Sequence, residues 1–272
     1  MKQIFETWRK TFRMLCKHPR IMLPMAIGAA LNVLFLYLLY LAPQRPMYYL
    51  LGPPVKTFFG ERFLHYPFNF YILPKLFSYA EVASGAFIGM LMVAVTIGMV
   101  AQVVKGERPS LLVNLIRGIR RYFSLIGIWL IIISLIFIIG KAAVKIIPPS
   151  SGIASLFVIA GLFMAAVSVH MIFIYVVPLL IIRQKSFFSS IKENAILLKN
   201  LFIPTVMLVM MPAFMYLPFA FLKAKPVFLA NKFYPEAVFF FLIAGIIASV
   251  LLDMLITVST TILFLERGRN EA

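Results

Sequence analysis

Six long apolar segments constrain what this chain can fold into. A helix needs about 20 predominantly apolar residues to cross the hydrocarbon layer of a bilayer, and each segment reaches that length. They are residues 21–42, 82–104, 122–147, 153–182, 201–222 and 237–265. The chain is 62% hydrophobic and only 13% charged, whereas soluble domains are about half apolar and a quarter charged. The sequence therefore predicts one all-α integral membrane domain over residues 1–272, a bundle of six transmembrane helices, and excludes a water-soluble fold.

The distribution of basic residues predicts the orientation of this bundle. Six spans place both termini on one side of the membrane, and that side carries 17 of the 26 Lys and Arg residues. Cytoplasmic loops of membrane proteins are enriched in Lys and Arg, so we expect both termini in the cytoplasm and the protein in the inner membrane of a bacterium. Because the basic residues flank apolar spans, the expected partners are anionic lipid headgroups rather than nucleic acid.

Three basic, amphipathic stretches run directly into apolar segments, near residues 1, 110 and 186. In the first stretch, a helical wheel places Trp8 and Leu15 in an apolar arc opposite the basic side chains. The basic residues are Arg9, Lys10, Arg13 and Lys17 in the first stretch and Arg117, Arg120 and Arg121 in the second. Such patterns predict in-plane helices on the cytoplasmic side. They either anchor the bundle or form a docking surface for a partner or a sensor of lipid composition.

The recurrence of these stretches also suggests an internal organisation. If each amphipathic helix precedes one outward and one inward span, the chain consists of three hairpin units in tandem. The entrances of two spans, Ile-Met-Leu-Pro at residues 21–24 and Leu-Phe-Ile-Pro at 201–204, support this only faintly. The repeat is therefore a hypothesis about architecture.

Residues 43–81 form the longest predicted connection and are rich in aromatic rings. Those near its centre are Phe63, His65, Tyr66, Phe68 and Phe70. Aromatic side chains favour the membrane interface, so the sequence predicts an outer cap with a short helix near 55–63 and a turn at 66–67. The cap either packs over the mouth of the bundle, admits a lipid or another amphiphile, or binds an outer partner.

Polar side chains interrupt the apolar segments near their centres. Asp253 lies in the last segment, His170 in the fourth and Asn32 in the first. Ionisable residues inside a membrane cost a few kcal/mol and commonly mark functional sites. They either hydrogen-bond between helices, handle a proton or a substrate, or lie nearer the lipid boundary than the segment limits suggest.

Sequence motifs of common enzymes are missing. The chain has no HExxH, GxSxG, P-loop or GxGxxG pattern. Its three histidines are far apart in the predicted topology, and its single cysteine, Cys16, excludes an internal disulfide and a Cys-based metal site. We therefore expect a protein that is not an enzyme and that uses no metal or cofactor.

Three stretches carry a resemblance to a known group of proteins. They are WRKTFRMLCKHPRIMLP at residues 8–24, KGERPSLLVNLIRGIRR at 105–121 and YVVPLLIIRQKSFFSSIKENAILLKNL at 175–201. The chain resembles bacterial six-span inner-membrane proteins that include the membrane domain of some glycerophosphodiester phosphodiesterases. The resemblance implies a helical integral-membrane domain and transfers no catalytic residues.

Two functional hypotheses follow from these features. The first is a scaffold or accessory subunit in envelope or lipid-related processes, which would bind a cytoplasmic or membrane protein partner through its basic surface. The alternative is a small transporter or lipid-translocating permease that uses Asp253 and His170. The sequence leaves the substrate, the partner and the oligomeric state open.

Overall fold

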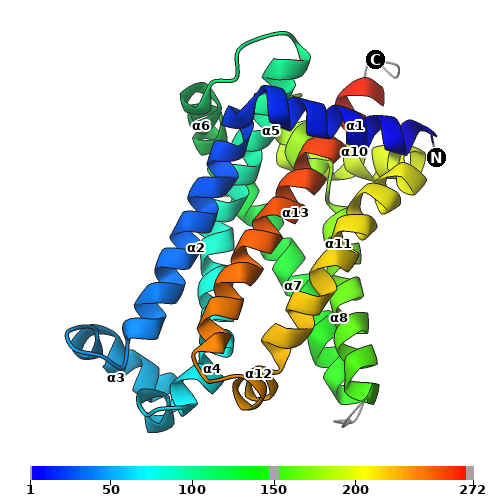
Figure 1. Ribbon diagram of the computed structural model, residues 1–272. Helices are drawn as coiled ribbons and strands as arrows, with labels where there is room; N and C mark the ends of the chain where they lie inside the picture. Colours follow the sequence, from blue (N-terminus) through cyan, green and yellow to red (C-terminus); the bar gives the residue numbers. More distant parts are fainter. Residues whose placement is uncertain (1, 147–152, 268–272) are drawn as a thin grey trace.

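In the computed structural model, six long apolar helices form a bundle (Figure 1). The structure describes residues 2–146 and 153–267. The helices long and apolar enough to cross a membrane cover Pro19–Leu41, Phe68–Val104, Tyr122–Ala143, Phe157–Ile181, Phe202–Ala224 and Ala237–Arg267. The predicted all-α, six-span architecture is confirmed, and the protein is a multi-pass membrane protein.

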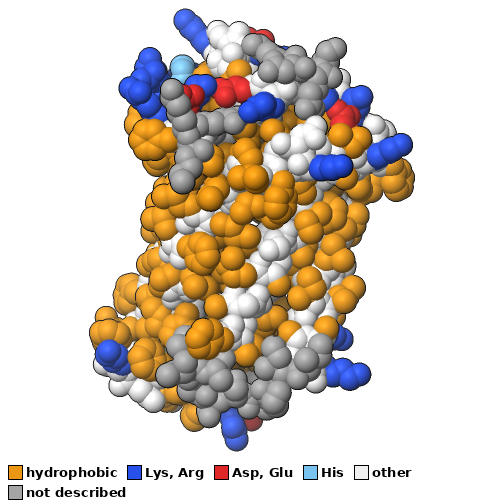
Figure 2. Space-filling model, turned by 90° about the vertical axis from the view of Figure 1, so that its right-hand side faces the viewer, with side chains coloured by type: hydrophobic (Ala, Val, Ile, Leu, Met, Phe, Trp, Pro, Cys, Tyr) orange, Lys and Arg blue, Asp and Glu red, His pale blue; other side chains and the backbone are white. Residues whose placement is uncertain are grey.

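The surface of the molecule matches a lipid environment. Figure 2 shows hydrophobic side chains around the middle of the bundle, with Lys and Arg gathered at its two ends. Large apolar side chains in the spans point outward: Phe137 is 61% exposed, Phe157 73% and Phe240 60%. An exposed apolar belt of this kind would be unstable in water but is the stable arrangement in hydrocarbon.

The elements follow one another along the chain in an order that repeats. They are α1 (Lys2–Lys17), η1 (Pro19–Met22), α2 (Leu23–Leu41), α3 (Met47–Phe59), η2 (Glu61–Leu64), α4 (Phe68–Ser84), η3 (Gly85–Gly89), α5 (Met90–Val104), α6 (Leu111–Arg120), α7 (Tyr122–Ile146), α8 (Ile153–Ile172), α9 (Val176–Ile181), α10 (Phe187–Asn200), α11 (Phe202–Ala224), α12 (Pro226–Lys232) and α13 (Ala237–Arg267). The short helices α1, α6 and α10 lie at one end of the bundle, and α3 and α12 lie at the other (Figure 1).

The predicted outer loop is shorter than the sequence indicated. Residues 68–81, assigned to the loop, belong to α4, which continues through the π-helical turn η3 into α5. The short helix is α3, which begins before residue 55, and the predicted turn at Tyr66 and Pro67 is present. Lys75 and Glu81 lower the hydropathy of α4, so the apolar segment predicted from the sequence, 82–104, began too late to include most of this helix.

The six spans form a ring of three helical hairpins. Contacts run from α2 to α5, α5 to α7, α7 to α8, α8 to α11 and α11 to α13, and α13 closes the ring on α2. Each hairpin follows a short helix, which packs against the span that ends the preceding hairpin: α6 on α5, α10 on α9 and, across the closure, α1 on α13. This recurring neighbour relation supports the hypothesis of three tandem units.

The three short helices share a buried polar residue at the same register. In each helix this residue lies eight positions before the first residue of the following span. The pairs are Thr11 before Pro19, Asn114 before Tyr122 and Asn194 before Phe202. All three polar side chains are buried. Asn114 and Asn194 use this position to hydrogen-bond the neighbouring span, at Gln102 and at the backbone of Ile172 and Tyr175, whereas Thr11 bonds to the carbonyl of Thr7 in its own helix.

Candidate functional site

A central cavity of about 560 Å³ lies inside the ring. Its walls include residues from all six spans, among them Gly28 of α2, Trp129 of α7 and Tyr216 of α11. Ligand sites in proteins commonly enclose about 300–1,000 Å³, so the cavity has room for a small molecule or for the headgroup of a lipid. Most of its lining is apolar, which suits an amphiphile.

The three polar residues singled out within the apolar segments all line this cavity. Asn32 reaches it from α2, His170 from α8 and Asp253 from α13. These helices are far apart in the sequence and meet only in the folded bundle. Ser249, Thr257 and Thr260 of α13 add hydroxyl groups to the same wall.

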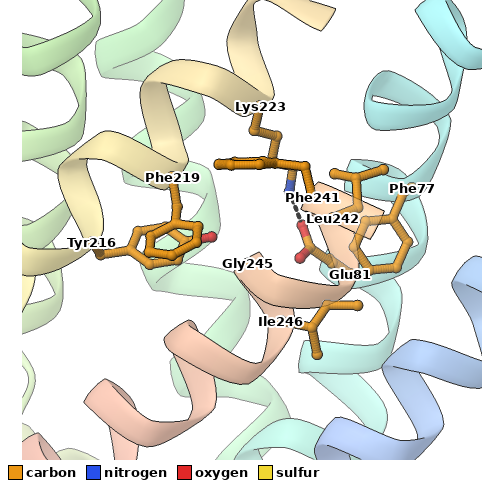
Figure 3. A pocket seen from close by; sticks show the side chains of 9 residues that line it. All are labelled: Phe77, Glu81, Tyr216, Phe219, Lys223, Phe241, Leu242, Gly245 and Ile246. Atoms are coloured by element: carbon orange, nitrogen blue, oxygen red, sulfur yellow. Dashed lines mark hydrogen bonds and ion pairs between the residues drawn. The ribbon is translucent and has the colours of Figure 1, made fainter. Parts of the chain in front are cut away.

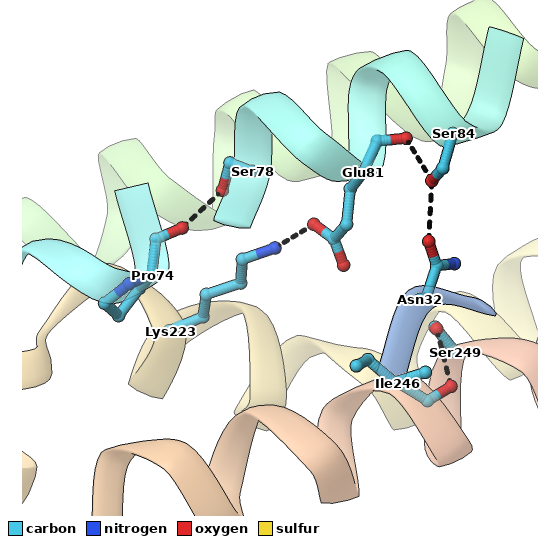
Figure 4. A network of polar contacts seen from close by, with 8 residues as sticks. All are labelled: Asn32, Pro74, Ser78, Glu81, Ser84, Lys223, Ile246 and Ser249. Atoms are coloured by element: carbon cyan, nitrogen blue, oxygen red, sulfur yellow. Dashed lines mark hydrogen bonds and ion pairs between the residues drawn. The ribbon is translucent and has the colours of Figure 1, made fainter. Parts of the chain in front are cut away.

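Asn32 and Asp253 differ in how their polar atoms are satisfied. Asn32 Oδ1 lies 2.6 Å from the hydroxyl of Ser84, which also lies 3.1 Å from the carbonyl of Glu81 (Figure 4). Within residues 2–146 and 153–267, no hydrogen bond or ion pair joins Asp253 to His170 or Asn32. A carboxyl group that faces a cavity in the membrane without such a partner is costly, so it is available for a ligand.

A second group of polar residues borders the cavity and was not identified from the sequence. Glu81 of α4 forms an ion pair with Lys223 of α11 (Figure 4). Glu81 and Tyr216 line both the central cavity and a small adjacent pocket (Figure 3). Glu81 was placed in the outer loop because it directly precedes the apolar segment 82–104. The sequence did offer one signal for Glu81, since it is the one acidic residue in α4.

Two irregular helical turns border the cavity. The π-helical turn η3 contributes Gly85 and Gly89 to its wall, and π turns occur frequently at functional sites. The fourth span breaks between α8 and α9, where Asn194 of α10 accepts a hydrogen bond from Tyr175 N at 3.0 Å and donates one to Ile172 O at 2.7 Å. Asn194 thus satisfies backbone groups that the break leaves without helical partners.

The basic residues predicted for the membrane surface lie on α1 and on α6 or, for Arg121, directly after α6, at the end where both termini of the described chain are found (Figure 1). Lys10 pairs with Glu266 at 2.7 Å, and Arg121 donates a hydrogen bond to Gln184 O at 3.0 Å. Arg9, Arg13, Lys17 and Arg120 are exposed, and Arg117 is partly exposed.

The apolar arc expected on α1 is divided between two environments. Leu15 is buried together with Thr7 and Thr11, whereas Phe5 is 75% exposed and Phe12 53% exposed. The reason is that α1 contacts α13 and α11 with the side that carries Thr7, Thr11 and Leu15. The side that carries Phe5 and Phe12 is more apolar but points away from this contact. The exposed phenylalanines are left free to face lipid.

The aromatic residues of the outer connection do not form one site. Phe63 and Phe70 are buried in two different clusters, with Val55 and with Leu242 respectively. His65, Tyr66 and Phe68 are exposed. Packing thus accounts for part of this aromatic group, and none of these residues lines the central cavity.

Among the described residues, no group of three or more His, Cys, Asp or Glu side chains is placed to hold a metal ion. The polar groups that line the cavity are carboxylates, an imidazole, an amide, hydroxyls and the indole of Trp129. Comparisons of the chain with protein-family models, with curated proteins and with solved structures find no match.

Proposed function

We propose that this protein is a small membrane transporter or lipid permease whose substrate is an amphiphile bound in the central cavity. The observation that carries the proposal is the 560 Å³ cavity lined by all six spans, with the side chain of Asp253 on its wall. An apolar lining with a few polar groups is typical of a site that holds one polar head and an apolar body. Binding inside a ring of spans, near their centres, is how many transporters hold substrate.

The proposal extends to the orientation and location of the protein. The short helices α1, α6 and α10 and the excess of Lys and Arg mark the cytoplasmic end, in the inner membrane of a bacterium. In this arrangement α1 lies in the plane of the membrane surface, with Phe5 and Phe12 toward the acyl chains and its exposed basic residues near anionic headgroups. Each such residue contributes about 1 kcal/mol of attraction to these lipids.

A cavity-filling substitution tests the transporter. Gly28 lines the cavity, and a Cβ added there would meet only Met92 Cγ, at 3.9 Å. We expect Gly28→Leu to displace a copurifying amphiphile when the protein is extracted with its surrounding lipids and analysed by mass spectrometry. Gly161→Leu is the matched control, because Gly161 has no heavy atom within 4 Å of an added Cβ and does not line the cavity.

The control variant should retain the amphiphile that the wild type carries. If the wild type carries none, or if both variants retain it equally, the central cavity is not a substrate site. Transport in reconstituted vesicles should then be measured for the amphiphile so identified, with Asp253→Asn expected to slow it by about tenfold, the effect of losing a contact of ~1.4 kcal/mol.

A scaffold or accessory role is the second candidate, favoured by the exposed basic residues on α1 and α6. Arg9, Arg13 and Arg120 are exposed at the same end of the bundle, and so are accessible to a protein partner. Under this hypothesis, Arg117→Gln with Arg120→Gln reduces copurification of a stoichiometric subunit and leaves the bound amphiphile unchanged. Unchanged copurification would count against it.

A further inference from the structure

The ammonium group of Lys223 lies in a small pocket of aromatic rings and one carboxylate (Figure 3). It pairs with Glu81, and its Nζ is 5.3 Å from the ring centroid of Phe77. The ring of Phe219 borders the same pocket, with its centroid 5.5 Å from that of Phe241 and 6.0 Å from that of Tyr216. A carboxylate surrounded by aromatic faces is the chemistry by which proteins recognise alkylammonium groups.

This aromatic pocket adjoins the central cavity. Glu81 and Tyr216 belong to both linings, so the carboxylate of Glu81 is within reach of a ligand in the cavity. The side chains of Lys223 and Glu81 are 22% and 30% exposed, which shows that the ion pair is not sealed in the protein. Lys223 lies one residue before the end of α11, and its four-carbon stem is flexible enough to withdraw.

The space left in the pocket is about 10 Å³, room for about one water molecule. A second ammonium group therefore does not fit while Lys223 is in place. A cationic ligand at Glu81 has to displace Lys223 before it binds.

The charges on the cavity wall favour a cation. Glu81 and Asp253 are the acidic residues that line it, and Lys223 balances only one of them. His170 is the other ionisable group that faces the space besides Tyr216. An anionic ligand would be repelled by the two carboxylates, and this repulsion is strong in a medium of low dielectric. A ligand with one positive charge would instead neutralise the carboxylate that Lys223 does not pair with.

We propose that Glu81 and its aromatic neighbours form the binding site for the ammonium group of a cationic amphiphile, and that Lys223 occupies this site as a tethered substitute when the ligand is absent. This inference rests on the proposed function, which it sharpens by naming the substrate class. Lys223 then acts as an internal competitor: Glu81 pairs with a bound cation when one is present and with Lys223 when it leaves, so the carboxylate is never left unpaired.

Equilibrium binding of two ions of the same shape and opposite charge tests the site. The probes are tetraphenylphosphonium and tetraphenylborate, and the protein is reconstituted in nanodiscs of zwitterionic lipid. The wild type should bind the cation and not the anion. Lys223→Gln, which removes the competitor, should tighten cation binding about tenfold, equivalent to ~1.4 kcal/mol. The double variant Glu81→Gln with Lys223→Gln should reverse this gain completely.

The two variants form a matched pair, because both lack Lys223 and differ only in the charge of residue 81. The double variant also leaves neither partner buried without its counter-charge, which protects the fold. Lys225→Gln controls for general electrostatics, since it removes the same charge two residues further on, beside the ring of Phe221; its affinity should equal that of the wild type.

Several results would overturn the inference. They are unchanged or weaker cation binding in Lys223→Gln, equal affinities of Lys223→Gln and the double variant, and preference of the wild type for the anion. Failure here is distinguishable from failure of the proposed function. If an amphiphile copurifies and Gly28→Leu displaces it while these affinities do not change, the cavity is a substrate site and Glu81 is not its cation site. If the affinities change as expected but no amphiphile responds to Gly28→Leu, the cation site stands and the transporter does not.

Discussion

In the apolar segments, the sequence identified candidate site residues only where a polar or ionisable side chain stands among apolar neighbours. Asp253 and His170 are ionisable groups in otherwise apolar helices, so their sequence context alone marked them, and the structure places both on the cavity wall. Asn194 and Asn114 lie in helices that contain many polar residues, and nothing in the sequence distinguishes a buried polar residue there from a solvated one. Their role depends on backbone groups in other helices, which only the folded chain brings near.

Asn194 provides the sharpest prediction for a single residue. Asn194→Ala removes the acceptor of the Tyr175 N–H group and the donor to the Ile172 carbonyl. Each buried backbone group left unsatisfied costs about 1–3 kcal/mol, so with two such groups the free energy of unfolding should fall by roughly 2–6 kcal/mol. Titration with a denaturing detergent measures this loss. Lys192→Ala, at an exposed position in the same helix, should change the free energy far less, and equal losses in the two variants would contradict the role given to Asn194.

At the scale of elements, the sequence predicts the spans well because hydrophobic length alone decides them. The first, third, fifth and sixth begin within two residues of the predicted positions. The second was predicted too short, since the helix Phe68–Val104 includes Pro74, Lys75 and Glu81. At 1.5 Å per residue its 37 residues extend about 55 Å, more than the ~30 Å hydrocarbon layer. A helix of this length either tilts or extends past the hydrocarbon layer, and its length accommodates polar residues that a span of minimum length does not.

The contact between α5 and α6 depends on two glycines. A Cβ at Gly98 would overlap the amide of Asn114, and one at Gly118 would lie 2.8 Å from Leu91 Cδ1. The amide of Asn114 is in turn fixed by a 2.7 Å hydrogen bond to Gln102 Oε1, so it has little freedom to move away. These small residues let the short helix lie close against its span, as small residues do between membrane helices.

Alanine substitutions test this close approach. Gly98→Ala should lower the free energy of unfolding by about 1–3 kcal/mol, the usual cost of overpacking. Gly161→Ala is the control, because nothing lies within 4 Å of its added Cβ. It should be neutral or stabilise the protein by up to about 1 kcal/mol, since glycine is the poorer helix former. Thermal unfolding in the same detergent compares the two, and a stable Gly98→Ala variant would show that α6 can shift without cost.

At the scale of the whole molecule, the tandem order of hairpins is visible in the sequence but the closed ring is not. The apolar segments and the three amphipathic stretches give the order of units. At the closure α13 packs on α2 and α1 packs on α13. Besides the Lys10–Glu266 ion pair, the contact between α1 and α13 is made by common apolar side chains. Trp8 and Ile4 of α1 join a cluster with Leu263 and Phe264 of α13. No local pattern assigns such residues to one partner rather than to lipid, so closure and the cavity that it encloses follow only from three-dimensional packing.

The orientation of the ring gives the last prediction, which single cysteines test. Cys16 is exposed but shares its side of α1 with Phe5 and Phe12, so it is first replaced by serine. In this Cys16→Ser background, Lys17→Cys reports on the end of the molecule where α1, α6 and α10 gather, because Lys17 is exposed on the basic side of α1. With that end in the cytoplasm, a membrane-impermeant maleimide should leave Lys17→Cys unlabelled in intact cells and label it after permeabilisation. Glu61→Cys at the opposite end should react in intact cells, because Glu61 is exposed in η2. Labelling of Lys17→Cys in intact cells would reverse the orientation, so that α1, α6 and α10 and their basic residues would face outward and a cytoplasmic partner for them would be excluded. The cavity and its carboxylates would be unaffected, because they depend on the packing of the ring and not on which side it faces.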